Sequence, residues 1–417
     1  MLQPIFHHND GTVNCSGVAL QRSQIRFLYL NLGHFLDHLF MLVFATVAAL
    51  HLGSEWELSY AELIPYATPG FIAFGVCALL AGWIADKWSR EGMIVVFFIG
   101  IGMSSIATGM ANNPLQIAIG LTLIGIFAAI YHPVGLAMVV QDRDKTGMPL
   151  AINGVFGNLG VASAALLTGF LIDNAGWRSA FYIPGLVSIV LGIAYWVFIA
   201  HEPPPVAGPA SAAKPKPAAA PIAKQTLIRV FAIIFFTTAI GGLIFQSTTF
   251  ALPRIFAERL TDFAGTATQV GWYAFLVFSL AAMAQLLIGY LVDHHSLRLV
   301  FATVALSQAV FFYLMTHLEG VAALVLAIAF MFVVFGQIPI NDVLVGRIAR
   351  SEWRSRAYAL RYVVTFSVMA SAVPLIGWLH ANGGFSRLFG VLSVAAALIF
   401  CATLLLPGSS QSLGRRV

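Results

Sequence analysis

The chain has 417 residues, of which 59% are hydrophobic and only 9% charged, and its net charge is +5. A soluble domain carries about a quarter charged residues, so this composition excludes an ordinary soluble protein and predicts an integral membrane protein. The small positive charge does not indicate nucleic-acid binding, and three cysteines far apart in the sequence indicate neither a disulfide framework nor a metal motif.

Twelve long apolar segments follow one another along the chain, each suited to cross the roughly 30 Å hydrocarbon core of a bilayer as a helix. Unbroken apolar runs favour helices over the alternating strands of a barrel. The predicted spans lie at about residues 25–51, 63–85, 92–111, 114–140, 150–172, 178–200, 227–253, 268–292, 299–317, 320–345, 356–380 and 385–406. The predicted fold is therefore an all-α membrane protein with 12 transmembrane helices.

The spans form two sets of six, joined by a segment rich in Pro, Ala and Lys that cannot build a core. The predicted organisation is a tail at 1–24, a first bundle at 25–200, a linker at 201–225, a second bundle at 226–406 and a tail at 407–417.

Most Lys and Arg residues lie in connections on one side, so the positive-inside rule places both tails and the linker in the cytoplasm. The outer connections would hold only Arg178, Arg254, Arg259 and Arg387. We expect a multi-pass protein of a bacterial-type inner membrane.

The two halves repeat one another. GWIADKWS, from Gly82, matches GYLVDHHS, from Gly289, at an offset of 207 residues. ASAALLTGFLIDNAGW, from Ala162, matches ASAVPLIGWLHANGGF, from Ala370, at an offset of 208 residues. Two matches at nearly one offset indicate an internal duplication, a design that recurs in secondary transporters with the substrate site between the repeats.

The stretch GWIADKWSRE, residues 82–91, resembles the loop signature of the major facilitator superfamily, and residues 289–298 resemble a second copy of it. Together with the six-plus-six plan, this resemblance covers nearly the whole chain. It implies two pseudo-symmetric six-helix bundles that work by alternating access around a central substrate cavity. The gating residues that we assign are Gly82, Asp86, Lys87, Arg90, Gly289, Asp293, Arg298 and, near the inner end of the tenth span, Asp342.

These charges also have a physical interpretation. Asp86 can pair with cationic groups or helix ends on neighbouring elements, and a few such contacts can stabilise one state of a rocking bundle. Lys87 and Arg90 can equally be cytoplasmic anchors of the positive-inside kind.

A narrower resemblance is to fosmidomycin-resistance-type exporters. It depends on His34, on IYHPVGLAMV at 130–139 and on GVFGNLG at 154–160, and it implies export. The chain departs from proton-coupled drug antiporters because its fourth span contains no arginine.

The first span carries a polar face. Asn31, His34 and His38 lie at i, i+3 and i+7, with Asp37 beside His38, so they share one side of the helix. An ionisable group at mid-bilayer costs at least about 2.5–3.5 kcal/mol on insertion scales, so it normally faces a cavity or a partner. The aligned positions of the seventh span are Ile240, Leu243 and Ile244, which favours a functional role because only one half has the polar face.

Three interpretations of this face are open. Burial disfavours the charged forms of carboxyl and imidazole groups, which brings both toward proton exchange near neutrality. His34 and His38 at i, i+4 could instead share a metal ion, or the groups could bond only to each other and to neighbouring helices. We prefer the proton relay, formed by His34, Asp37, His38 and, in the fourth span, His132, and assign no metal ligand.

Other polar residues within the spans are candidates for substrate binding, although each amide could equally join two helices. They are Asn31, Asn158, Gln246, Gln285, Asn341 and Arg361. Asp342 and Arg361 lie at similar depth in successive spans, so we expect them to pair in preference to a direct contact of Arg361 with substrate.

These features predict a proton-coupled secondary active transporter that exports a small polar or amphipathic solute, and the resemblance implies an antiporter. The alternatives are a histidine-dependent divalent-metal transporter and a non-transporting membrane scaffold. A GxxxxGK[ST] loop is lacking, so direct use of ATP is not expected. We expect no enzymatic activity, no cofactor and no nucleic-acid partner. The expected partners are substrate, protons and lipid, with a monomeric chain.

Overall fold

The computed structural model describes residues 21–141, 143, 146–201, 224–348 and 354–407. The predicted linker at 201–225 and the predicted tails at 1–24 and 407–417 lie almost entirely outside these residues. Within them, all regular secondary structure is helical, and 12 helical segments are long and apolar enough to cross a membrane. The predicted 12-helix architecture is confirmed, with boundaries that differ from the expected ones by a few residues at most ends.

The first half contains six spans, of which three are built from more than one helical piece. Their bounds are α1 (Arg22–Val47), η1 (Ala48–Leu52) and α2 (Gly53–Trp56); α3 (Tyr60–Leu63), η2 (Ile64–Ala67) and α4 (Thr68–Lys87); α5 (Arg90–Gly109); α6 (Pro114–Ala128), η3 (Tyr131–Gly135) and α7 (Leu136–Val140); α8 (Gly147–Ala175); and α9 (Ser179–Ala200). The segments η1 and η3 are π-helical turns, and η2 is a 3₁₀ turn.

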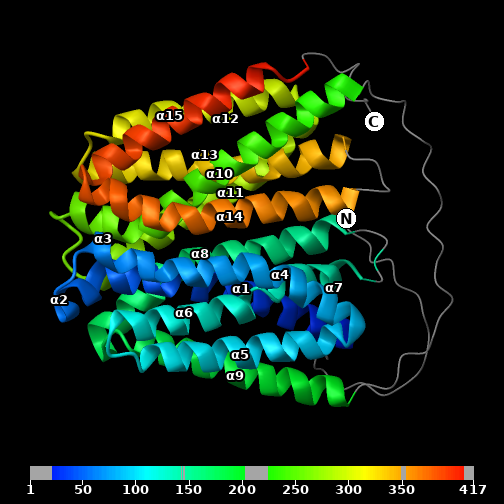
Figure 1. Cartoon of the computed structure of the whole chain (residues 1–417), viewed down its shortest axis with the longest axis vertical. Helices are drawn as coiled ribbons and strands as arrows, with labels where there is room; N and C mark the ends of the chain where they lie inside the picture. The colour runs from blue at the N-terminus through cyan, green and yellow to red at the C-terminus, as the bar shows by residue number, and fades with distance from the viewer. Residues whose placement is uncertain (1–20, 142, 144–145, 202–223, 349–353, 408–417) are drawn as a thin grey trace, which may run out of the picture.

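The second half contains six helices, each of a single piece. They are α10 (Lys224–Arg259), α11 (Ala267–His294), α12 (Leu297–Met315), α13 (Gly320–Ile348), α14 (Arg354–Ala381) and α15 (Gly384–Leu404). The halves lie one above the other in Figure 1, with α8 next to α11 and α4 next to α14 at their junction.

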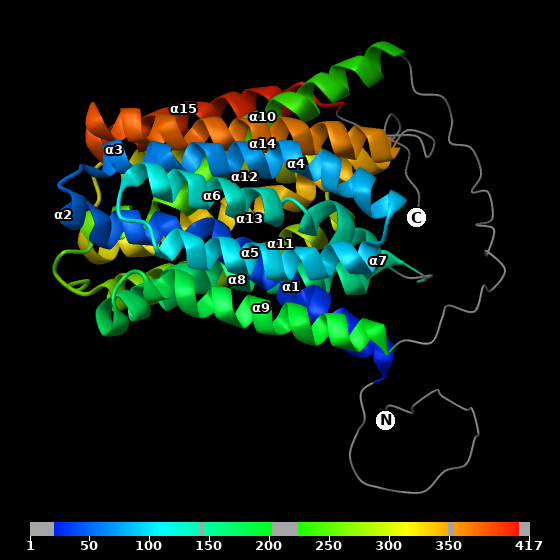
Figure 2. The same ribbon diagram turned by 60° about the horizontal axis from the view of Figure 1, so that its bottom comes forward.

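The bundle has two ends, which we name by the helices that lie at each. We call the end with α2 and α3 the distal end, and the end at which α1 begins and α15 finishes the terminal end; they face left and right in Figures 1 and 2. Short polar residues start several helices at these ends. Ser59 Oγ accepts from Glu62 N at 3.3 Å, Ser89 Oγ from Gly92 N at 3.0 Å, and Asn113 Oδ1 from Gln116 N at 3.0 Å. Such caps satisfy amides that have no partner inside the helix.

Glycines allow the two halves to touch backbone to backbone where α8 meets α11. A Cβ at Gly169 would lie 2.2 Å from the carbonyl oxygen of Ala267, and one at Gly271 would lie 2.6 Å from that of Ala165. No side chain fits at either distance. Small residues are the usual means of close helix packing in a bilayer, where apolar burial does not drive helices together.

Asp173, at the distal end of α8, caps the first turn of α11 in the opposite half. Its Oδ2 accepts from Thr268 N at 2.7 Å and from Thr268 Oγ1 at 2.5 Å, while its Oδ1 accepts from Ala267 N at 3.3 Å. A carboxylate at a helix N-terminus is also favoured by the helix dipole. The cap therefore joins the two halves.

A second contact joins the halves at the same end. Arg254 Nη1 of α10 donates to the carbonyl oxygen of Ala49 at 3.0 Å, and the same guanidinium forms an ion pair with Glu258 at 2.8 Å. Its cationic carbon lies 5.6 Å from the centre of the Tyr60 ring in α3. The distal end is thus closed by polar contacts between the halves.

We expect Asp173→Ala to shift the protein toward a state with an open distal end, because the first amides of α11 lose their acceptor. A lost cap costs about 1 kcal/mol, roughly a fivefold change in a two-state ratio. The measurement is the distance distribution between spin labels at the exposed positions Asn174 and Asp262, in a variant without other cysteines.

Asp173→Asn is the matched control, because an asparagine oxygen also caps helices well. It should keep the short distance. An unchanged distribution in Asp173→Ala would show that the cap does not contribute to closure.

Candidate functional site

Four ionisable side chains meet inside the first half: His34, Asp37 and His38 of α1, and His132 of η3. We call them the histidine–aspartate cluster. His34 Nε2 and His38 Nε2 are 3.2 Å apart, and His132 Nε2 lies 3.4 Å from Asp37 Oδ2. Asp37 is fully buried and His34 is 7% exposed, while His38 and His132 are partly buried. The structure therefore brings together the four residues that the sequence assigned to proton coupling.

The π-helical turn η3 presents His132 to α1. Pro133 has no N–H, and its ring clashes with the carbonyl four residues earlier, so an α-helix is interrupted there. The chain continues instead through a π turn at Tyr131–Gly135, a feature often found at functional sites. Gly82 of α4 leaves room for this turn, because a Cβ at Gly82 would lie 3.3 Å from Pro133 Cβ.

A buried network from α8 orients His34. The backbone oxygen of Asn153 accepts from His34 Nδ1 at 2.8 Å, and Asn153 Nδ2 donates to Asn31 Oδ1 and to the Tyr131 hydroxyl, each at 2.9 Å. A carbonyl oxygen can only accept, so Nδ1 of His34 carries the proton and Nε2 presents its lone pair to His38. The Tyr131 ring stacks on His34 with its centroid 4.9 Å away.

Two glycines of α8 make this arrangement possible. A Cβ at Gly157 would lie 2.7 Å from Cε1 and Nε2 of His34, and one at Gly160 would lie 2.2 Å from the carbonyl oxygen of Phe35. Glycines at these positions let α8 pack directly against the imidazole and backbone of α1. The glycine-rich stretch at 154–160 therefore forms one wall of the cluster.

Sequence reasoning missed Asn153 and Tyr131 and selected Asn158 instead. Asn153 is fully buried at the centre of the network, whereas Asn158 is half-buried and lies outside the hydrogen bonds described above. The available signal was the helical phase: Asn153 lies one turn before Gly157, on the face that contacts α1. Asn31, predicted as a substrate-binding residue, is buried and bonded to Asn153, and its binding role stays a prediction.

In the second half, the expected ion pair is present. Arg361 Nη2 of α14 lies 2.5 Å from Asp342 Oδ1 of α13. The adjacent Asn341 accepts a weak hydrogen bond from Thr237 Oγ1 at 3.4 Å. Gln246 is buried on α10, and Gln285 is half-buried on α11.

Two further glutamines extend the polar interior of the second half and were not predicted. Gln308 Nε2 of α12 donates to Gln337 Oε1 of α13 at 2.9 Å, and Gln337 Nε2 donates to the backbone oxygen of Thr237 at 3.4 Å. They join α10, α12 and α13. These residues therefore act as links between helices.

The residues assigned to gating lie at the terminal end. Asp86 forms an ion pair with Arg90 at 2.9 Å across the turn from α4 to α5. Lys87 and Asp293 are exposed, Arg298 is half-buried, and a Cβ at Gly289 would meet open space. Their gating roles stay predictions.

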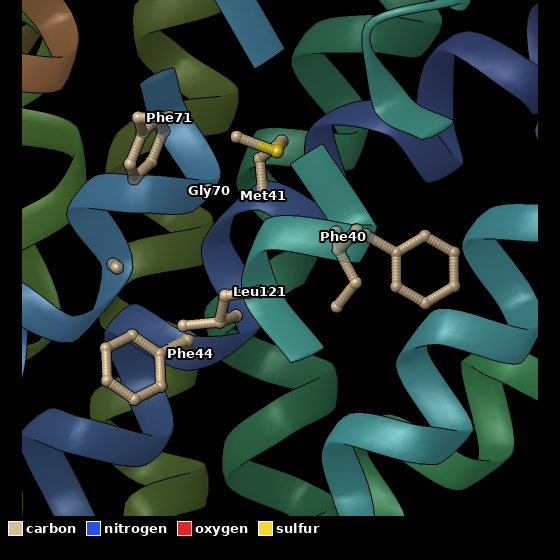
Figure 3. A pocket seen from close by; sticks show the side chains of 8 residues that line it. Phe40, Met41, Phe44, Gly70, Phe71 and Leu121 are labelled. Carbon is tan, nitrogen blue, oxygen red and sulfur yellow. The ribbon is translucent and has the colours of Figure 1, made fainter. Parts of the chain in front are cut away.

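A small apolar pocket lies against α1, and Figure 3 shows the side chains that line it. The pocket begins at Phe40, two residues after His38, and it lies between α1, η2, α4 and α6. Its lining consists of Phe40, Met41, Phe44, Ala67, Gly70, Phe71, Leu121 and Ile124. Apolar and ionisable groups are therefore adjacent along one helix.

The sequence model of the Major Facilitator Superfamily matches residues 30–261 and 255–415. The chain belongs to the Major Facilitator Superfamily. The predicted family is thereby confirmed, and the homologues and the fold are those of membrane transporters and not of enzymes.

Individual relatives are distant. A gallate transporter of Pseudomonas putida is 27% identical over 147 residues, which is 35% of this chain and 33% of that protein. A tetracenomycin C resistance and export protein of Streptomyces glaucescens is 28% identical over 137 residues, 31% of this chain and 25% of that protein. The chain thus spans about a third or less of the length of these curated relatives.

The fold extends over nearly the whole chain of a solved structure. A bacterial homologue of the human lysosomal transporter Spinster, crystallised in an inward-facing and unoccupied conformation, superposes with a TM-score of 0.70 at 16% identity, covering 93% of this chain and 98% of that one. At this identity the likeness concerns the fold alone. It agrees with the 12-helix, two-bundle architecture.

We expect Asn153→Ala to destabilise the first half, because Asn31 and the Tyr131 hydroxyl lose a buried partner. Leaving buried polar groups without partners costs about 1–3 kcal/mol. The measurement is the thermal unfolding of purified protein, followed by the loss of monodisperse elution after heating. The variant should unfold at lower temperature than the wild type.

Asn158→Ala provides the comparison on the same helix. Since Asn158 lies outside the network, its variant should unfold like the wild type. Equal losses in both variants would contradict the central position given to Asn153.

Proposed function

We propose that the protein is a proton-coupled secondary active transporter that exports a small polar or amphipathic solute by alternating access, as an antiporter. Family membership supports transport. The observation that carries proton coupling is the buried cluster in a membrane-spanning helix, in which the Asp37 carboxyl group contacts His132 and His34 contacts His38. Ionisable groups at such a depth are costly and commonly mark proton pathways.

The geometry supports a proton relay of two linked pairs. His34 Nε2 accepts a proton from His38 Nε2 through their 3.2 Å contact, and His132 can donate to Asp37 across 3.4 Å. A buried carboxylate is stabilised by a protonated imidazole and destabilised without it, so its charge depends on whether His132 holds a proton. Binding or loss of one proton then changes the relative free energies of the two transporter states.

The proposed orientation places both termini in the cytoplasm of a cell with a bacterial-type inner membrane. The uneven distribution of Lys and Arg supports it. In this orientation the distal end, which Asp173 and Arg254 close, faces outward. Export is supported by the resemblance to fosmidomycin-resistance-type proteins and by the relative whose name includes export.

The solute is proposed to contact both polar and apolar surfaces. The apolar part of the solute is proposed to contact the apolar side chains around Phe40 and Phe71, although the pocket between them is too small to hold a solute in this state of the protein. Asn158, Gln246, Gln285, Asn341 and Arg361 remain proposed polar contacts, and the gating residues remain proposed as well. We propose a monomer as the transporting unit.

The proposal is tested in proteoliposomes loaded with a pH-sensitive dye. Addition of fosmidomycin or gallate, one acidic drug and one aromatic acid, should produce proton movement in the wild type that a protonophore abolishes. In Asp37→Asn this movement should fall at least tenfold, because the amide cannot carry the proton, while exchange of labelled solute without a gradient continues.

His295→Ala serves as the matched control, because His295 is an exposed histidine at the end of α11. Its proton movement should equal that of the wild type. Solute accumulation that a protonophore leaves unchanged would contradict proton coupling, and solute exchange that stops in Asp37→Asn would assign Asp37 to binding instead.

A further inference from the structure

The three histidines of the cluster are spaced as ligands of one ion. One ring nitrogen each of His34, His38 and His132 lie within 4.8 Å of one another. In a tetrahedral zinc site the Zn–N distance is about 2.0–2.1 Å, which places neighbouring ligand atoms about 3.3 Å apart. The contacts at 3.2 Å between His34 and His38 and at 3.4 Å between His132 and Asp37 match two edges of such a tetrahedron.

The hydrogen bond from His34 to Asn153 orients His34 as a metal ligand. Histidines that bind metals usually donate their second ring N–H to a carbonyl or carboxylate, which fixes the tautomer. His34 does this through its 2.8 Å bond to the Asn153 oxygen, so its Nε2 lone pair faces the centre of the cluster. The Tyr131 ring stacks on the imidazole, and Gly157 lets α8 pack closely against it.

The cluster also contains buried polar atoms that the described residues leave without a hydrogen bond. These atoms are Nδ1 of His132 and both carboxyl oxygens of Asp37, of which Oδ2 has only the 3.4 Å contact with His132. Leaving such atoms without partners is costly. A cation between the imidazoles and the carboxylate would compensate the Asp37 charge.

We propose that His34, His38, His132 and Asp37 form a binding site for a divalent transition-metal ion, with Zn²⁺ as the best fit. Three imidazoles and one carboxylate are a usual ligand set for zinc in a tetrahedral site. Ca²⁺ and Mg²⁺ prefer oxygen ligands only, so this set selects against them. The ion and the proposed proton relay use the same ring nitrogens and the same carboxylate, so protons and Zn²⁺ compete for this site and a bound ion suspends the relay.

All four ligands belong to the first half, three on α1 and one on η3. An ion bound there connects these two elements and does not bridge the halves. The site therefore remains intact when the halves move relative to each other, and it should bind the ion without any solute or gradient present.

The test is a calorimetric titration of the purified full-length protein in nanodiscs, without an affinity tag, using ZnCl₂. We expect one ion per chain in the wild type, and an affinity at least tenfold lower in His34→Ala and in His132→Ala. His294→Ala should bind as the wild type does, because His294 is exposed at the end of α11. A variant with alanine at His7 and His8 should also retain the site, since these adjacent residues, like His294 and His295, are a closely spaced pair outside the cluster.

Cobalt gives a second readout that needs no variant. Co²⁺ bound to the wild type should show the intense visible absorption of a tetrahedral ion, and added Zn²⁺ should remove it. Weak octahedral absorption, or Zn²⁺ binding that persists in the His34, His38 and His132 triple alanine variant, would overturn the proposal. Because the titration involves no transport, its failure leaves the proton-coupling assay unaffected, and the reverse is also true.

Discussion

The close packing of α8 against α1 is the contact on which the candidate site depends. Gly157 and Gly160 remove the side chains that would keep the helices apart, and the space is taken by the His34 ring and the Phe35 backbone. This brings the Asn153 oxygen within 2.8 Å of His34 Nδ1. One contact between helices thus determines the position, the tautomer and the burial of the first histidine, and His38 and His132 are placed relative to it.

The helices, the duplication and the polar face of α1 could be predicted because they depend on local features of the sequence. Apolar length identifies a membrane span, and a 3.6-residue period places His34, Asp37 and His38 on one face. The Asp342–Arg361 pair was also predictable, because two opposite charges at similar depth on successive helices can meet.

The remaining part of the site depends on how helices are rotated against one another. Asn153 and Asn158 are the same residue type on the same helix, so the sequence alone does not tell them apart. Asn153 lies one turn from Gly157, on the side of α8 that packs against α1, and it is therefore the buried one. Likewise, His132 could be named as a candidate from its place beside Pro133, but its contact with Asp37 arises from a π turn that hydrophobic periodicity does not reveal.

The π turn at Tyr131–Gly135 has a consequence for how α6 and α7 are connected. A π turn accommodates one residue more than an α turn, and in an α-helix each residue accounts for about 100° of rotation. The faces that α7 presents to its neighbours are therefore displaced by about that angle from those an uninterrupted helix would present. Relaxing the turn to α geometry would move His132 away from Asp37 and rotate α7 at the same time, so the chemistry of the cluster and the orientation of the helix end are set by the same local geometry.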